Sequence, residues 1–400
     1  MEKKEKYILM YKNDEVLSFT VSFGKSSKVE IIKKLSHFDK APYGMKDDSS
    51  LDELKNILFR FLNERTIAGP RWDYVDIIKY TGVKDAFELS FKGHGLSLSN
   101  HYWYKKEDEN LKYEDINFFT NKWDDSFAKA VLSGNYEALR NVDLNVPDIV
   151  TDGWSIKGWL YENGEPRLYK IGIAKDHSEE PLAEVLSSRL AKRMFGSGQS
   201  LEYELKEIYG KYASCCKTLI KVDEELIPLV RVVSPTLSNL YSAKFNDHNL
   251  TKPFFEELSK CDIPGIYEFF IKLSCWRTLC FANDLHFNNL SVIRNIKTSQ
   301  MRLAPLFDFG SSFGGSEKAR AFLSHPNKAS YLIIYFLYGD LDPNWDYSWY
   351  HKESLDGFEE EIKETLSKSE FYTPELIQNI LNVYHYQKDS LTSLAEHKSN

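Results

Sequence analysis

Residues 283–289 read Asn-Asp-Leu-His-Phe-Asn-Asn, and residues 303–310 read Leu-Ala-Pro-Leu-Phe-Asp-Phe-Gly. The first stretch follows an apolar run at 266–281 whose spacing is typical of a long buried helix. Short apolar runs at 290–293 and 301–306 predict two strands after the polar stretch. The order helix, polar loop, two strands and Asp-Phe-Gly decides how the rest of the chain is interpreted.

Three oxygen-bearing side chains in these stretches have the spacing that phosphoryl transfer requires. Asp284 and Asn289 are five residues apart, which is the D-x-x-x-x-N spacing of the protein-kinase catalytic loop. In that chemistry the first carboxylate orients the attacking hydroxyl and accepts its proton. The Asn amide and the Asp of Asp-Phe-Gly hold Mg²⁺, a hard cation that prefers oxygen ligands. Asp308 is the candidate for that second metal ligand. The alternative is that these residues only form turns and caps, which are common positions for Asp and Asn.

A lysine and a glutamate upstream supply the other charges of such a site. Lys170 lies in a predicted strand, 167–173, and Glu184 lies on a predicted helix, 181–194. A lysine inside an apolar strand needs a partner, because an unpaired buried ammonium is costly, and Glu184 can supply it. The alternatives are a strand-edge lysine whose ammonium reaches water and a glutamate on the solvated face of its helix.

A short loop precedes the lysine strand. Thr151-Asp152-Gly153 leads into a predicted hairpin whose turn contains Asn163-Gly164, and Asn-Gly between apolar runs is the strongest short hairpin signal. The loop lacks the G-x-G-x-x-G pattern of a glycine-rich phosphate loop. Asp152 and Gly153 are nevertheless candidates for contact with phosphates, and Lys157 can add positive charge.

Composition is that of a globular protein with an acidic balance. The 400 residues are 42% hydrophobic and 28% charged, with a formal net charge of −8, which argues against a general nucleic-acid binder. The charged start, Met1 to Lys6, is unlike a secretory signal peptide, and no apolar run is long enough to span a bilayer. The five cysteines are odd in number and form no C-x-x-C pair. They therefore predict a reducing, cytoplasmic setting and argue against a disulfide framework or a zinc site.

Three regions follow from the predicted elements. Residues 1–145 form an α+β module without evident chemistry, residues 146–233 a small antiparallel sheet with one helix, and residues 234–400 a mainly helical region. The further elements are a hairpin at 7–11 and 16–23, helices at 51–62, 74–80 and 128–139, the last broken near Gly134, strands at 146–150, 201–209, 214–221 and 225–233, and helices at 330–337, 355–366 and 374–386.

At this point the chain resembles the HipA-like serine/threonine kinases, the bacterial toxin-type branch of the protein-kinase-like fold. The resemblance is carried by residues 283–289 and 303–310, with support from Lys170, Glu184 and a module placed before the small lobe. It has motif support over about residues 145–320. It implies an α+β, protein-kinase-like fold with two lobes, a small antiparallel-sheet lobe and a mainly helical large lobe, preceded by the N-terminal α+β module.

The resemblance also implies an ATP- and Mg²⁺-dependent kinase that phosphorylates Ser or Thr hydroxyls of a protein. Adenine is expected near the strand at 214–221. Relatives can autophosphorylate a Ser in the small-lobe loop, which ejects the loop, and Ser155 lies in the corresponding segment. The implied roles are Asp284 as catalytic base, Asn289 and Asp308 as metal ligands, Lys170, positioned by Glu184, with Asp152, Gly153 and Lys157 as ATP-binding residues, and His286 as a support of the catalytic loop.

Two positions depart from the family's usual loop, N-x-D-x-H-x-K-N. Asn288 stands where the family often has Lys, which removes a cation that can contact phosphate, and Asn283 directly precedes Asp284 without an intervening residue. Two other functions therefore stay open. One is a non-catalytic scaffold or corepressor beside a small DNA-binding antitoxin, and the other is the same fold with AMP transfer or lipid-head-group phosphorylation. The resemblance points to a translation-related enzyme, such as an aminoacyl-tRNA synthetase, as the protein substrate. No residue here selects one.

Overall fold

The protein forms two compact units, which are described separately. Residues 1–169, 220–226 and 295–299 make up the first unit, and the remaining residues the second. The boundaries predicted at residues 145 and 233 separate an N-terminal module and two lobes, which is a different division from that into compact units. These boundaries stay a prediction. The computed structural model describes residues 3–24, 27–172, 179–233, 257, 260–261, 263–282, 289–315 and 346–396.

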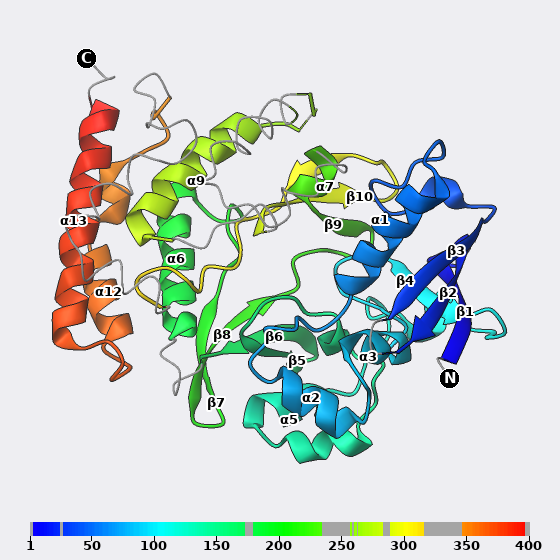
Figure 1. Cartoon of the computed structure of the whole chain (residues 1–400). Coiled ribbons are helices and arrows are strands. Elements are labelled where there is room, and N and C mark those ends of the chain that lie inside the picture. The colour runs from blue at the N-terminus through cyan, green and yellow to red at the C-terminus, as the bar shows by residue number, and fades with distance from the viewer. Residues whose placement is uncertain are drawn as a thin grey trace. The chain divides into compact units, whose positions relative to one another are not determined.

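An antiparallel sheet opens the first unit. Its strand order is β3-β2-β1-β4, and the predicted hairpin is confirmed as β1 and β2, which pair from Lys3↔Phe23 to Tyr11↔Asp14. The described elements of this unit are β1 Lys3–Tyr11, β2 Asp14–Phe23, β3 Lys28–Lys34, η1 Phe38–Lys40, α1 Leu51–Asn63, α2 Tyr74–Thr81, α3 Ala86–Lys92, β4 Tyr102–Lys106, α4 Tyr113–Ile116, α5 Ser126–Ser133, η2 Tyr136–Asn141, η3 Pro147–Ile149, β5 Ile156–Glu162 and β6 Glu165–Ile171 (Figure 1).

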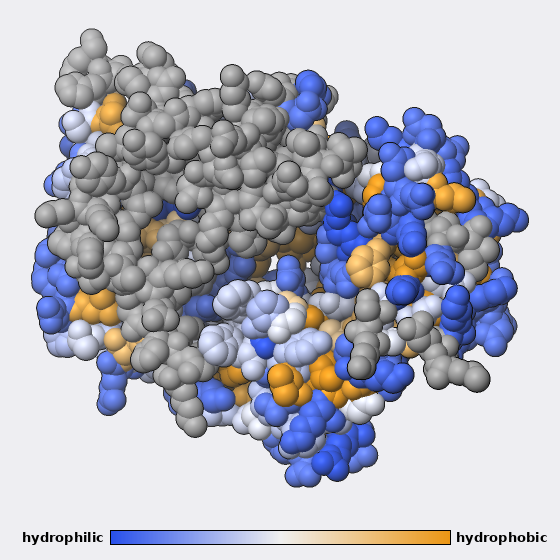
Figure 2. Space-filling model, in the orientation of Figure 1, coloured by the Kyte–Doolittle hydropathy of each residue, from blue (hydrophilic) through white to orange (hydrophobic). Residues whose placement is uncertain are grey.

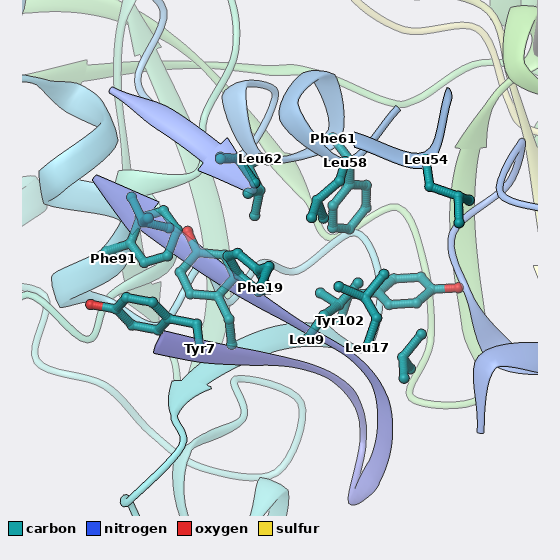
Figure 3. Close-up of a cluster of buried hydrophobic side chains, with 14 of the residues drawn as sticks. Tyr7, Leu9, Leu17, Phe19, Leu54, Leu58, Phe61, Leu62, Phe91 and Tyr102 are labelled. Atoms are coloured by element: carbon teal, nitrogen blue, oxygen red, sulfur yellow. The ribbon is translucent and has the colours of Figure 1, made fainter. Parts of the chain in front are cut away.

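The core of this unit lies between α1 and the sheet. The predicted helix start is confirmed, because Ser50 and Glu53 form a capping box that satisfies two of the free N–H groups at the start of α1. Figure 3 shows the apolar face of the helix directed at side chains of the strands. The buried residues of this face are Leu54, Leu58, Phe61 and Leu62, and those opposite include Leu9, Leu17 and Phe19.

The chain between α5 and β5 differs from the prediction. The strand predicted at 146–150 is wrong, because residues 147–149 form a short 3-10 helix that begins with proline. Proline has no N–H to donate to a ladder and suits the first turn of a helix. Gly134 ends α5 in a left-handed conformation, so the predicted break in the helix at 128–139 is confirmed.

The second unit is built around α6. Helix α6 packs against β8, α9 and α12, and Figure 1 shows α12 and α13 side by side near the C-terminus. The division between the units falls within three strands: Lys170 and Ile171 of β6 belong to the second unit, whereas residues 224–226 of β9 and Asn295 of β10 belong to the first. The other described elements are α6 Glu180–Phe195, β7 Glu204–Ile208, β8 Lys211–Lys217, β9 Glu224–Pro228, α7 Leu229–Val233, α9 Ile266–Cys280, β10 Ser291–Asn295, β11 Met301–Leu303, η7 Lys352–Leu355, α12 Phe358–Leu366 and α13 Pro374–Glu396.

Most of the predicted elements of this unit are present. Strands β7 and β8 form one antiparallel pair and β10 and β11 another, as the sequence predicts. The strand predicted at 225–233 is wrong in its second half, where α7 follows Pro228. The helix predicted at 330–337 lies outside the described residues. Among the residues coloured in Figure 2, hydrophilic surface predominates, with hydrophobic patches between. Across the described residues, no helix is long and apolar enough to cross a membrane.

Candidate active site

Three charged side chains that the sequence singles out meet in the second unit. Lys170 Nζ lies 3.0 Å from Glu184 Oε1 and 2.6 Å from Asp308 Oδ1. Strand β6 supplies the lysine, α6 the glutamate and the segment after β11 the aspartate. Lys170 is 7% exposed and Glu184 fully buried, so the edge-lysine and solvated-glutamate alternatives are excluded. The ammonium therefore bridges two carboxylates that are far apart in the sequence.

The environment of Glu184 holds its carboxylate in one orientation. Ser214 Oγ on β8 donates to Glu184 Oε2 over 2.5 Å, and the backbone N–H of Phe309 donates to Oε1 over 3.3 Å. Both carboxylate oxygens therefore have hydrogen-bond donors in addition to Lys170. A buried charge is tolerated when it is paired and hydrogen-bonded in this way.

Electrostatics keep Lys170 charged. Burial alone lowers the pKa of its ammonium, but the carboxylates of Asp308 and Glu184 outweigh that effect, so the pKa is raised well above the ordinary value for lysine. Lys170 is therefore a permanent cation, suited to neutralising an anion rather than to exchanging protons. Its partner Asp308 has a side chain that is 44% exposed, so the buried cation is paired with an anion that reaches solvent.

The backbone at Asp308 is unusual. Its φ of 64° is left-handed, a conformation that Asp and Asn adopt more readily than other non-glycine residues. The N–H of Asp308 donates to the hydroxyl of Tyr203 over 3.4 Å. Gly310 passes so close to α6 that an added Cβ would lie 3.0 Å from Cβ of Glu180. The segment is thus positioned by its backbone as well as by its charge.

Phe309 anchors the same segment in the core. It is 3% exposed, and its ring centroid lies 5.7 Å from that of Tyr203 and 4.9 Å from that of Trp276. Trp276 Nε1 in turn donates to the carbonyl of Ser187 on α6 over 3.0 Å. The sequence gives no local signal for Tyr203, Ser214 or Trp276 in these roles, because each acts across elements rather than through a neighbour in the chain.

Asn289 and Asp308 line one small pocket of the second unit, together with Trp276 and Phe309. The two candidate metal ligands therefore border a common space, and their side chains both contain oxygen atoms. The candidate base Asp284 and the loop residue His286 lie outside the described residues, so their predicted roles stay predictions.

The candidate phosphate loop lies in the first unit. Gly153 has a φ of 90°, and an added Cβ would lie 2.9 Å from Lys157 Nζ, so this position requires glycine. Lys157 is 8% exposed and its ammonium donates to the backbone carbonyl of Asp152. Ser155 is 5% exposed. The hydrogen bond from Lys157 to Asp152 therefore links the two ends of the loop, and Ser155 is buried between them.

Residues from before α2, which the sequence did not mark, contact this loop. Arg71 is 2% exposed and pairs with Asp73, with Nε 2.6 Å from Oδ1. Its Nη1 donates to Thr151 Oγ1 over 2.8 Å, and its Nη2 donates to the carbonyl of Lys157 over 2.9 Å. The contact joins residues about 80 positions apart, so local sequence patterns could not reveal it.

A second buried carboxylate lies beside the loop. Asp148 is fully buried, and its Oδ1 accepts a hydrogen bond from the N–H of Trp159 over 2.8 Å. Its Oδ2 has no hydrogen-bond partner among the described residues. Burial raises the pKa of this carboxyl to about 7, although the N–H of Trp159 and the charge of Arg71 act in the opposite direction.

Comparisons with known proteins find the fold but no close relative. No family model and no curated protein matches the chain. A similar solved structure is HipA of Shewanella oneidensis MR-1, from a toxin–antitoxin system, in complex with HipB and its operator DNA. It is 13% identical with a TM-score of 0.50, and the match covers 98% of this chain and 97% of HipA. Another is the Helicobacter pylori proinflammatory kinase CtkA, 14% identical with a TM-score of 0.44, covering 62% of this chain and 92% of CtkA.

The match to HipA extends over almost the whole of both chains, so this protein has the HipA-type, protein-kinase-like fold. The predicted fold class, α+β with antiparallel sheets and a mainly helical remainder, is confirmed. The resemblance to HipA-like kinases is likewise confirmed at the level of the fold.

Proposed function

We propose that this protein is an ATP- and Mg²⁺-dependent kinase that transfers a phosphoryl group to Ser or Thr hydroxyls of a protein in the cytoplasm. The observation that carries the proposal is the contact of Lys170 with both Glu184 and Asp308. In protein kinases, a strand lysine paired with a helix glutamate and an Asp-Phe-Gly aspartate must be in place together for phosphoryl transfer. The same three residue types meet here in a kinase-like fold.

The donor set fits a magnesium–nucleotide complex. Asp308 and Asn289, whose side chains contain oxygen atoms, both line one pocket, and Mg²⁺ is usually held by one or two carboxylates together with substrate phosphates rather than by a protein cage. When bound, the ion would neutralise charge on the transferring phosphoryl group.

The chain's own residues divide the remaining work. Lys170 would bind phosphate oxygens and Glu184 would hold Lys170 in position, while Asp284 would accept the proton of the substrate hydroxyl. Asp152, Gly153 and Lys157 would form the phosphate loop, His286 would support the catalytic loop, and Ser155 is the proposed site of autophosphorylation. Because Ser155 is buried, its modification requires the loop to open.

A protein partner forms part of the proposal. The HipA structure that covers nearly the whole chain contains HipB and operator DNA, so a small DNA-binding antitoxin is the partner that we propose for this chain. With a net charge of −8, this chain is not expected to hold DNA by itself.

Substitution of Asp308 tests the proposal. Asp308→Asn keeps a residue that tolerates the left-handed backbone but removes the negative charge, so we expect phosphoryl transfer to fall by about a hundredfold or more. The measurement is transfer of label from γ-labelled ATP to proteins of a host lysate, with and without Mg²⁺. Asp389→Asn, on an exposed position of α13, is the matched control and should retain full activity.

The modified target also distinguishes the alternatives. A mass increase of one phosphate supports a kinase, whereas the larger increase of one AMP would identify AMP transfer. Full labelling by Asp308→Asn would contradict the proposal. Wild-type protein that binds no Mg-ATP would favour the scaffold instead, and Asp284→Ala in the same lysate identifies labelled bands that depend on the proposed base.

A further inference from the structure

Two consecutive residues of the N-terminal module hold the loop 151–157 at three points. Arg71 donates to Thr151 Oγ1 at the start of the loop and to the carbonyl of Lys157 at its end, over 2.8 and 2.9 Å. The backbone N–H of Trp72 donates to the carbonyl of Trp154, in the middle, over 3.2 Å. The start, middle and end of the stretch 151–157, whose last two residues begin β5, are therefore attached to a single short segment.

That segment is itself rigidly held. Arg71 forms a two-pronged pair with Asp73, with Nε–Oδ1 and Nη2–Oδ2 distances of 2.6 and 3.1 Å. Its backbone N–H donates to the carbonyl of Ala68 over 2.9 Å, and its carbonyl accepts from Tyr74 at the start of α2 over 3.0 Å. The guanidinium therefore donates to fixed acceptors on three sides, namely Asp73, Thr151 and the carbonyl of Lys157. A lysine has a single ammonium and cannot reproduce this planar pattern.

The loop held in this way is the one that our proposed function assigns to ATP phosphates. Its inner face is already shaped by Gly153 in a left-handed conformation and by the ammonium of Lys157 against the carbonyl of Asp152. A phosphate site depends on the prior orientation of the groups that line it, because ordering them during binding costs affinity. Arg71 contacts Thr151 and Lys157, at the two ends of the stretch. Because both ends are fixed, the residues between them have fewer accessible conformations.

We propose that Arg71 is a positioning residue for nucleotide binding, which holds loop 151–157 in its binding shape from the N-terminal module. This inference rests on the proposed function, and it gives residues 1–145 a role in the reaction. Arg71 touches neither nucleotide nor metal in this scheme. It acts through the main chain of Lys157 and the hydroxyl of Thr151, and the loop in turn contacts the phosphates.

The test compares two buried arginines of the same module. Arg71→Lys keeps the charge and loses the planar donors, so we expect the Kd for Mg-ATP to rise about tenfold, with kcat at saturating ATP changed less than twofold. Arg65 is the matched control, because it is 3% exposed and donates to the carbonyl of Gly95 and to Asn100, outside the loop. Arg65→Lys should lower the thermal midpoint of unfolding by about as much as Arg71→Lys does, while leaving the Kd for Mg-ATP unchanged.

A second measurement does not depend on activity. In Arg71→Lys without nucleotide, backbone amides of residues 151–157 should exchange with deuterium at least several-fold faster than in the wild type. Exchange in β1 and β2 should be unchanged. Arg65→Lys should leave the amides of the loop at their wild-type rates.

The outcomes separate this inference from the proposed function. If the wild type binds no Mg-ATP, the proposed function fails, and faster exchange in the loop would then show only that Arg71 orders it. If the wild type binds Mg-ATP and both lysine variants show equal Kd values, Arg71 is merely structural and the inference is overturned. A Thr151→Val variant completes a double-mutant cycle with Arg71→Lys, in which non-additive Kd changes support action through Thr151.

Discussion

The two units each bury a carboxylate beside a candidate nucleotide-binding element, but the two carboxylates differ in the partners of their oxygen atoms. Glu184 in the second unit accepts hydrogen bonds at both oxygens and contacts the ammonium of Lys170. Asp148 in the first unit has one hydrogen bond to Oδ1 and no partner at Oδ2 among the described residues. Both are fully buried. Burial is therefore the same in the two places, and only the partners differ.

This difference in partners places the two carboxyl groups in different electrostatic environments. The paired carboxylate stays beside a permanent cation, which suits a site that must hold its charges in fixed positions. The unpaired carboxyl has its pKa raised by burial to about 7, so its charge depends on pH near neutrality. The effect of this contrast on stability can be measured by removing a partner of Glu184 or by replacing the ionisable group of Asp148.

Removing the ammonium from Glu184 has the largest expected effect on stability. Lys170→Met leaves a buried carboxylate without its cation, and we expect the free energy of unfolding to fall by about 3–5 kcal/mol, measured by denaturant unfolding. The double variant Lys170→Met, Glu184→Gln should recover part of that loss, because it removes the fully buried charge and leaves only Asp308, whose side chain is 44% exposed, without its cation.

A surface pair provides the control for this prediction. Lys192 Nζ and Glu202 Oε2 are also 3.0 Å apart, but both side chains are about half exposed. Lys192→Met should therefore cost less than about 1 kcal/mol. Equal losses at Lys170 and Lys192 would show that burial of the first pair does not matter.

Removing one hydrogen bond from Glu184 should have a smaller effect. Ser214→Ala deletes the donor to Glu184 Oε2, and we expect a loss of about 1.5–3 kcal/mol, the range for hydrogen bonds to charged groups. Ser274 on α9 is the comparison, since its buried hydroxyl donates to the neutral carbonyl of Phe270 over 2.8 Å. If Ser274→Ala costs as much as Ser214→Ala, the charge of Glu184 plays no part.

The pH dependence of stability tests Asp148. Below about pH 4 its carboxyl is protonated in both the folded and the unfolded state. Between about pH 4 and pH 7 only the folded state keeps the proton, so this residue makes the free energy of unfolding fall as pH rises, by at most about 1.4 kcal/mol per pH unit. Asp148→Asn should remove this slope. Denaturant unfolding at pH 5, 6 and 7 checks it, and parallel curves for wild type and variant would refute the prediction.

Sequence reasoning found the parts of the site whose signal is local. A lysine in an apolar strand needs a partner, and the glutamate on the following helix could supply it, so the contact of Lys170 with Glu184 could be predicted. Asp308 was marked by the Asp-Phe-Gly motif and its place after two strands. The antiparallel hairpins were predicted for the same reason, because alternating apolar residues and turn signals lie next to one another in the chain.

Contacts between distant segments escaped prediction. Nothing around Arg71 indicates that its guanidinium reaches Thr151 and Lys157, because no spacing rule links residues so far apart. The strand predicted at 146–150 failed since its apolar residues suit a strand, but Pro147 favours the start of a helical turn. Similarly, the segment from Leu229 to Val233 is apolar apart from Arg231 and contains three valines, yet it forms α7, because the preference of β-branched residues for strands is weak and depends on context.

The close packing of α5 on β5 limits how far the protein can be truncated from its N-terminal side. At Gly158 an added Cβ would lie 2.8 Å from Cβ of Ala128, so the helix and the strand touch almost backbone to backbone. A truncated protein that started at residue 146 would lose that helix and the arginine behind the loop. It would also bare an apolar strand that invites aggregation. The smallest fragment worth expressing for biochemistry therefore includes the leading residues, even though the kinase motifs all lie downstream of them.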